Sequence, residues 1–125
     1  MKIRDYIFCD DIRHETNNKM SLMGVYHDRI LFRANKDKAL NFPIPIRLAS
    51  FVRLDLEQGD LTPDKFKYEL LLNGKSLVAL EGQINIDSQQ KMINVSIVGE
   101  GIPLELGSIG LKICILSKEK EIFNQ

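Results

Sequence analysis

The chain has 125 residues, its 17 lysines and arginines balance 17 aspartates and glutamates, and 44% of its residues are hydrophobic. This composition predicts one folded domain over residues 1–125, because disordered chains are less hydrophobic and carry more net charge. The zero net charge gives no overall attraction to nucleic acid or to an anionic membrane, so neither is an expected partner.

The first quarter of the chain predicts two strands joined by a turn. Residues 3–9 are rich in β-branched and aromatic side chains and end at an acid pair, and residues 20–26 form a second run of this kind. Between them, the sequence TNNK at residues 16–19 is typical of a turn. Gly24, in the middle of the second run, predicts a bulge or the close approach of another part of the chain.

The middle of the chain alternates between a polar break and a long strand. A short strand is expected over residues 29–33, followed by a polar break over residues 34–45. Pro43 and Pro45 are expected to prevent regular ladder hydrogen bonding there. Residues 46–59 then predict one long strand, or two with a kink, because apolar and charged side chains alternate in its second half.

The clearest local pattern is a hairpin. Apolar side chains alternate with mostly polar ones over residues 66–72, and Asn73-Gly74 follows directly. This dipeptide between two strand-like runs is typical of a type I′ turn. The returning strand is expected over residues 76–82 and to continue as far as Ile86.

The last third predicts two further strands. Residues 87–90 indicate a turn, residues 92–98 alternate between apolar and polar side chains, and residues 98–103 are expected to break that strand. Residues 109–115 alternate again, and a charged tail ends the chain.

These elements predict an all-β fold. No stretch shows a helical period over three turns, and residues 10–16 and 34–40 each have room for one or two helical turns at most. Short strands with turn signals roughly every 8–12 residues indicate an antiparallel β-sandwich of about seven to nine strands, with a barrel as the alternative.

The two cysteines and the first residues favour a cytoplasmic location. Cys9 and Cys114 lie in or beside apolar runs, where a free cysteine packs as a small hydrophobic side chain. Charged residues at positions 2, 4 and 5 interrupt any signal peptide, and no apolar run approaches the length of a membrane span. We therefore expect free thiols in a reducing compartment, with a disulfide as the alternative.

One segment concentrates chemically versatile side chains. The candidate metal ligands are Cys9, Asp10, Asp11, His14, Glu15, His27 and Asp28. Their spacing matches no zinc or calcium motif, and Arg13 and Lys19 are available to pair with the acids. No phosphate loop, dinucleotide fingerprint or nucleophile elbow occurs, so we expect no cofactor. A metal-dependent enzyme that uses residues 9–28 remains the catalytic alternative.

The same segment resembles the N-terminus of an uncharacterised family of short bacterial and phage-associated β-rich proteins. The resemblance rests on an apolar strand, then Cys9, the acid pair, Ile12-Arg13 and Glu15, an Asn18-Lys19 turn, and Leu22-x-Gly24-x-Tyr26. It implies a fold and a surface, without an activity, and it suggests that the acids, Arg13 and the turn form one feature. Arg13 is suited to fix this loop, because a guanidinium can bind a carboxylate with two hydrogen bonds.

These observations predict a non-enzymatic module that binds a protein partner. The binding surface is expected at a sheet edge or at a loop over residues 10–19, whose candidate residues are Asp10, Asp11, Arg13, His14, Glu15 and Lys19. Edges pair with partner strands and loops carry specificity, and a homodimer through the same edge is possible. A structural component of a phage particle is the remaining alternative.

Overall fold

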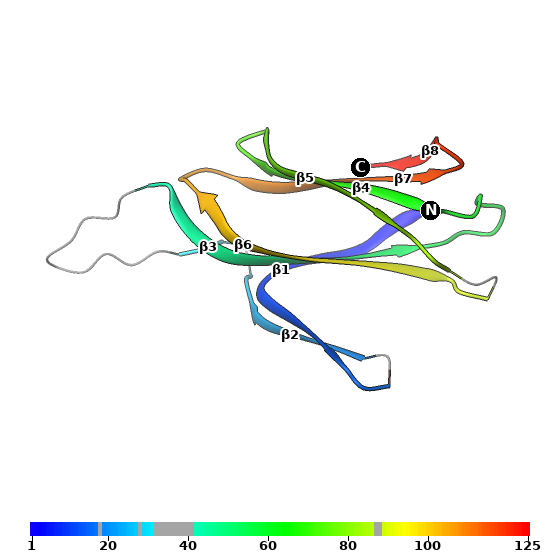
Figure 1. Cartoon of the computed structure of the whole chain (residues 1–125), viewed down its shortest axis with the longest axis horizontal. Coiled ribbons are helices and arrows are strands. Elements are labelled where there is room, and N and C mark those ends of the chain that lie inside the picture. Colours follow the sequence, from blue (N-terminus) through cyan, green and yellow to red (C-terminus); the bar gives the residue numbers. More distant parts are fainter. Residues whose placement is uncertain (18, 28, 32–41, 87–88) are drawn as a thin grey trace, which may run out of the picture. The chain divides into compact units, whose positions relative to one another are not determined.

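The computed structural model of the chain contains eight β-strands in two antiparallel sheets of four strands each (Figure 1). It describes residues 1–17, 19–27, 29–31, 42–86 and 89–125. The predicted all-β class and the predicted number of strands are confirmed, and two four-stranded antiparallel sheets are the elements of a β-sandwich. Within the described residues, no helix is long and apolar enough to cross a membrane.

The two sheets take their strands from different parts of the chain. The first has the order β2-β1-β3-β6, with β1 at Lys2–Glu15, β2 at Lys19–Val25, β3 at Ile44–Asp55 and β6 at Met92–Leu104. The second has the order β5-β4-β7-β8, with β4 at Lys65–Leu72, β5 at Lys75–Gln83, β7 at Ile109–Ser117 and β8 at Lys120–Asn124.

The chain divides into two compact units that follow the sheets. The first unit comprises Ile3–Arg53 and Asn94–Glu105, and the second comprises Met1–Lys2, Leu54–Ile93 and Leu106–Gln125. Each is described by itself below.

Strand β1 in the first unit is longer than the sequence predicts. It continues through the acid pair to Glu15, where a loop with one or two helical turns was expected. The physical reason is the partner strand, because Cys9 to Glu15 pair antiparallel with Val25 to Lys19. Pairing of this kind overrides the weak strand preference of aspartate. The expected turn is present, with Asn17 in the left-handed region at φ 60°.

Strand β3 is buried on both of its faces. Its buried side chains are Leu48, Ala49, Ser50, Phe51, Val52 and Leu54, which alternate between the two faces of the strand. The strand begins at Ile44 and therefore includes Pro45, although this proline was expected to prevent regular ladder hydrogen bonding there. A proline near the first residues of a strand is tolerated because few ladder bonds are lost there.

One face of β3 is covered by the β1–β2 hairpin. Cys9, Ile12, Ala49 and Phe51 form a buried cluster, against which Ile7, Met20 and Leu22 pack. We call these seven residues the hairpin core. Ser96 Oγ of β6 lies 4.0 Å from Met20 Sδ, so β2 reaches over the sheet as far as its last strand. The β1–β2 hairpin, which belongs to this sheet, therefore covers an apolar cluster on a face of the same sheet.

The second unit confirms the predicted β4–β5 hairpin. Asn73 and Gly74 have φ values of 53° and 79°, as a type I′ turn requires. The Asn73 side chain accepts the Ser108 N–H at 3.0 Å and donates to the Leu106 carbonyl at 3.2 Å, which ties this turn to the segment before β7. The returning strand ends at Gln83, so the predicted continuation to Ile86 is wrong.

Three other sequence predictions differ from the structure. Strand β6 runs without a break through residues 98–103 to Leu104. The charged tail forms a further strand, β8, after a turn in which Lys118 and Glu119 have positive φ. The expected strand over residues 29–33 is not formed at residues 29–31, and its remainder lies outside the described residues, as do residues 34–40.

Candidate functional site

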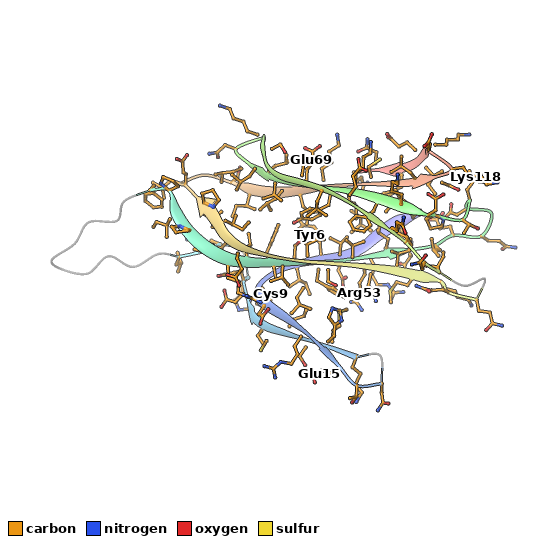
Figure 2. All side chains as sticks on the ribbon, in the orientation of Figure 1. Tyr6, Cys9, Glu15, Arg53, Glu69 and Lys118 are labelled. Atoms are coloured by element: carbon orange, nitrogen blue, oxygen red, sulfur yellow. The ribbon has the colours of Figure 1, made fainter. Side chains whose placement is uncertain are left out.

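The predicted binding residues lie on paired strands, so the expectation of a loop over residues 10–19 is wrong. Asp10, Asp11, Arg13, His14 and Glu15 belong to β1, and Lys19 begins β2. Glu15 pairs with Lys19 and His14 with Met20, next to the turn at the far end of the hairpin, where Figure 2 shows Glu15. Arg13, His14, Glu15 and Lys19 are exposed, whereas the acid pair is held in hydrogen bonds.

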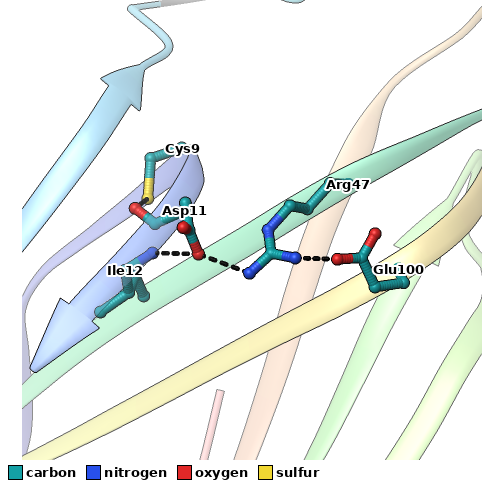
Figure 3. A network of polar contacts seen from close by, with 5 residues as sticks. All are labelled: Cys9, Asp11, Ile12, Arg47 and Glu100. Carbon is teal, nitrogen blue, oxygen red and sulfur yellow. Dashed lines mark hydrogen bonds and ion pairs between the residues drawn. The ribbon is translucent and has the colours of Figure 1, made fainter.

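Asp11 belongs to a polar network that joins three strands (Figure 3). Its Oδ1 accepts the Ile12 N–H at 2.9 Å and Arg47 Nη2 at 2.7 Å, and its carbonyl accepts the Cys9 thiol at 3.4 Å. Arg47 of β3 also forms an ion pair with Glu100 of β6 through its Nη1. The Arg47 guanidinium lowers the pKa of Asp11, so this carboxylate stays ionised and paired at neutral pH.

The prediction that Arg13 fixes the acid pair is corrected by this network. The guanidinium that donates to Asp11 belongs to Arg47, 36 residues further along the chain. Arg13 lies opposite Ser21 and contributes only the smallest of the charge effects on Asp11. The sequence shows no signal for the Arg47 contact, because it depends on which strands are neighbours in the sheet.

A second ion pair joins β1 and β3, at a position that agrees with the Asp11–Arg47 contact. Arg53 Nε donates to Asp5 Oδ1 at 2.8 Å, its Nη2 pairs with Asp5 Oδ2, and its guanidinium lies 5.9 Å from the centre of the Phe51 ring. Asp5 is six residues before Asp11 and Arg53 is six residues after Arg47, as antiparallel neighbours require. The hairpin core therefore lies between two ion pairs on one face.

These ion pairs predict how stability depends on pH. The pKa values of Asp5 and Asp11 are lowered, in each case chiefly by the hydrogen bond from an arginine. A carboxyl whose pKa is lower in the folded state stabilises the protein above its unfolded pKa, near 3.8, and loses that contribution as pH falls through the folded value. Asp5→Asn with Asp11→Asn should therefore lower the melting temperature at about pH 6 and flatten its fall toward about pH 3. If the melting temperature falls equally with pH in the variant and in the wild type, this assignment is contradicted.

Asp10 is hydrogen-bonded to Tyr26, the residue that directly follows β2. The Tyr26 hydroxyl donates to Asp10 Oδ1, and burial together with this carboxylate raises the pKa of Tyr26 to about 12. Gly24, between these residues, has a φ of 65°, and a Cβ at this position would collide with the Asp10 carboxylate. The predicted close approach at Gly24 is confirmed.

The thiols and the acids do not form a reactive centre in the described part of the chain. Cys9 and Cys114 are free and buried, and burial raises the pKa of both thiols, which keeps them neutral near pH 7. Among the described residues, no group of three or more His, Cys, Asp and Glu side chains lies close enough to hold a metal ion. Asp28, one of the predicted ligands, lies outside the described residues.

The most distinctive surface feature of the first unit is an open edge on β1. Pairing with β2 begins at Cys9, and the Tyr26 N–H donates to the Phe8 carbonyl at 2.9 Å, where the two strands part. Residues 3–7 of β1 therefore lie beyond the pairing with β2, while β3 is the neighbouring strand on the other side of β1. Tyr6 in this segment is 59% exposed and contacts Phe8 edge to face, with ring centres 6.3 Å apart.

Sequence reasoning did not locate this open edge. The alternation of residues 3–9 shows a strand, but the edge arises because β2 is offset toward the far end of β1. Length gave no signal either, because the two predicted runs, residues 3–9 and 20–26, are equally long, whereas the strands in the structure have 14 and seven residues. A short strand beside a long one leaves part of the long one without a partner.

The second unit carries one open pocket worth noting, with a volume of about 600 Å³. Three lysines (Lys65, Lys67 and Lys118) and three acids (Asp64, Glu81 and Glu119) line it. Lys67 and Glu81 lie 3.9 Å apart, and Asp64 accepts the Lys118 backbone N–H at 2.9 Å. Because its charges balance and several are already paired, this pocket favours no class of ligand.

Comparisons with known proteins identified no relative of this chain. The chain matches no protein-family model, and searches of curated proteins and of solved structures found no significant similarity.

Proposed function

We propose that this protein is a non-enzymatic recognition module that binds a protein partner by adding a strand to the open edge of β1. The observation that carries the proposal is that the pairing of β1 with β2 begins only at Cys9 and does not reach the segment around the exposed Tyr6. An open strand edge offers unpaired N–H and C=O groups, and a neighbouring aromatic side chain offers a contact for an apolar side chain of the partner.

The surroundings of the edge support this mode of binding. Phe8 is half-buried and braces Tyr6 through their edge-to-face contact, so the Tyr6 ring is held in place before a partner arrives. The opposite side of β1 is fixed to β3 by the two ion pairs of Asp5 and Asp11. A rigid edge loses less conformational freedom on binding than a mobile one.

The far end of the β1–β2 hairpin is a second contact surface within the same proposal. Arg13, His14, Glu15 and Lys19, four of the residues predicted to bind, are exposed there. We leave Asp10 and Asp11 out of this surface, because the Oδ1 atoms of both carboxylates already accept hydrogen bonds from Tyr26 and Arg47. No observation among the described residues favours a phage-particle component or a metal-dependent enzyme.

Two variants separate the edge from the hairpin end. Tyr6→Pro removes a backbone donor that faces the open side, and proline is tolerated on strand edges. Arg13→Glu with Lys19→Glu reverses the charges of the hairpin end. Affinity capture from host extract, followed by mass spectrometry, should lose a specific partner with Tyr6→Pro and retain it with the hairpin variant. The circular dichroism spectra of both variants should match that of the wild type.

Two other outcomes of the affinity capture would change the assignment of the binding surface or contradict the proposal. Loss of the partner with the hairpin variant alone would assign recognition to Arg13 and Lys19. Retention of every co-purifying protein by both folded variants would contradict the proposal.

A further inference from the structure

We propose that Met20 is an oxidation site, at which a hydroperoxide converts the thioether to a sulfoxide and thereby loosens the β1–β2 hairpin. This inference goes beyond the proposed function and does not depend on the edge of β1. It follows from the place of Met20 in the hairpin core, from its position opposite His14 and from its contact with Ser96.

Met20 lies at the rim of the hairpin core. Its side chain is half-buried and packs against the buried cluster of this core. In the pairing of β1 with β2, Leu22 lies opposite the buried Ile12, whereas Met20 lies opposite the exposed His14. Directly opposed residues share one face of two paired strands, so the core ends at the Met20–His14 pair. A small peroxide molecule therefore has a short path to Met20 in the folded protein.

The sulfur of Met20 is also the contact between the hairpin and the last strand of the sheet. Ser96 Oγ of β6 lies 4.0 Å from Met20 Sδ, and a thioether is only a weak acceptor for this hydroxyl. An oxygen bound to the sulfur would change the geometry of this contact and would itself require hydrogen bonds. Oxidation therefore acts at the point where β2 rests on the sheet.

The reaction transfers one oxygen atom and needs only the hydroperoxide as co-reactant. A lone pair of the sulfur attacks the terminal oxygen of the peroxide, and the O–O bond breaks as the S–O bond forms. The proton of the transferred oxygen moves to the leaving oxygen. Sulfur is oxidised and the hydroperoxide is reduced to water or an alcohol, and the sulfoxide can be reduced again by enzymes.

A sulfoxide at Met20 places a polar group against apolar side chains. The buried cluster contains Ile12 and Phe51, which offer no hydrogen bonds to the new oxygen. Burial of a polar group without its full hydrogen bonds is unfavourable, so the far end of the hairpin should move outward until the oxygen reaches water. That end carries Arg13 and Lys19, whose backbone would then lose its strand pairing.

Other sulfur atoms of the chain provide the comparison. Met23 directly follows Leu22, so its side chain lies on the other face of β2 from the hairpin core. Cys9 and Cys114 are buried, and burial raises the pKa of both thiols, so they react slowly with a peroxide near pH 7. Loosening of the hairpin is therefore expected from Met20 alone.

Peroxide treatment of the folded wild type, Met20→Leu and Met23→Leu tests the proposal. Leucine replaces methionine with little change in volume, so both variants should fold. After treatment with hydrogen peroxide, mass spectrometry of the wild type should find one added oxygen at Met20. Trypsin should then cut it at Arg13 and Lys19 at least about tenfold faster than the untreated protein.

The two variants and a reductase identify the residue responsible. Met23→Leu should respond to peroxide as the wild type does, whereas Met20→Leu should keep the cleavage rate of its untreated form. Reductases for both sulfoxide epimers should return the oxidised wild type to its original rate. Because Met20→Leu retains both cysteines, equal acceleration in this variant would assign the effect to another residue and overturn the proposal. So would a Met20 that stays unoxidised while free methionine in the same solution is oxidised, or an oxidised Met20 with an unchanged cleavage rate.

Discussion

Replacing Phe51 with alanine is expected to lower the free energy of unfolding by about 3–5 kcal/mol, the usual cost of removing a buried phenylalanine. Phe51 is 7% exposed at the centre of the hairpin core, where it packs with Cys9, Ile12 and Ala49. The loss includes the cavity left beneath the β1–β2 hairpin, because β1 is tied to β3 by the ion pairs of Asp5 and Asp11 and cannot close the cavity fully. Urea unfolding followed by circular dichroism measures this change.

Two further measurements show whether the loss comes from the hairpin core. Limited trypsin digestion should cut the Phe51→Ala variant faster than the wild type at Arg13 and Lys19, because loosening of the hairpin frees the backbone at both sites from strand pairing. Leu61→Ala is the control, since Leu61 is 52% exposed and its truncation should change stability by less than about 0.5 kcal/mol. An unchanged urea midpoint for Phe51→Ala would show that this cluster contributes nothing to stability.

Replacing Gly24 with valine is expected to lower the free energy of unfolding by more than about 2 kcal/mol, through the sum of two effects. The φ of 65° is unfavourable for a β-branched residue, with a strain of roughly 1–3 kcal/mol. The new side chain would also displace the Asp10 carboxylate, and the hydrogen bond from Tyr26 that is lost is worth roughly 1–3 kcal/mol.

Gly101 supplies the matched control for this substitution. It lies in β6 of the same unit with a φ of 63°, and nothing lies within 4 Å of a Cβ built on it. Gly101→Val therefore introduces the strain without the collision, and it should cost less than Gly24→Val. The Gly24 variant should also titrate Tyr26 at a lower pH, because the carboxylate that raises its pKa has moved. Equal losses of stability, with unchanged Tyr26 titration, would contradict the role of Asp10.

Patterns that depend on neighbouring residues in the sequence were predictable here. The alternation in β4 and the Asn73-Gly74 turn predict the hairpin that the structure contains, because strand period and turn chemistry are local properties. The β7–β8 hairpin was missed because its local sequence lacks such a turn signal. Its turn has Lys118 and Glu119 at positive φ in place of the asparagine and glycine that signal such a turn.

Features that depend on distant pairing were not predictable. The acids at residues 10 and 11 suggest the end of a strand, yet pairing with β2 carries β1 on to Glu15. Likewise, the donor to Asp11 is supplied by β3, so the chemically obvious neighbour Arg13 was the wrong assignment. The six predicted binding residues do lie in one hairpin, but two of them are held by structural contacts and the open edge of β1 lies before them.

The position of β6 in the sheet order has a consequence for the biosynthesis of this chain. β3 emerges from the ribosome with one of its two neighbours, β1, already made, but β6 follows only after the whole β4–β5 hairpin. Until then, an apolar strand of 12 residues has one unprotected edge, the condition that favours intermolecular association of nascent chains. Slow translation between residues 56 and 92 should therefore lower the soluble yield more than an equal delay after residue 104.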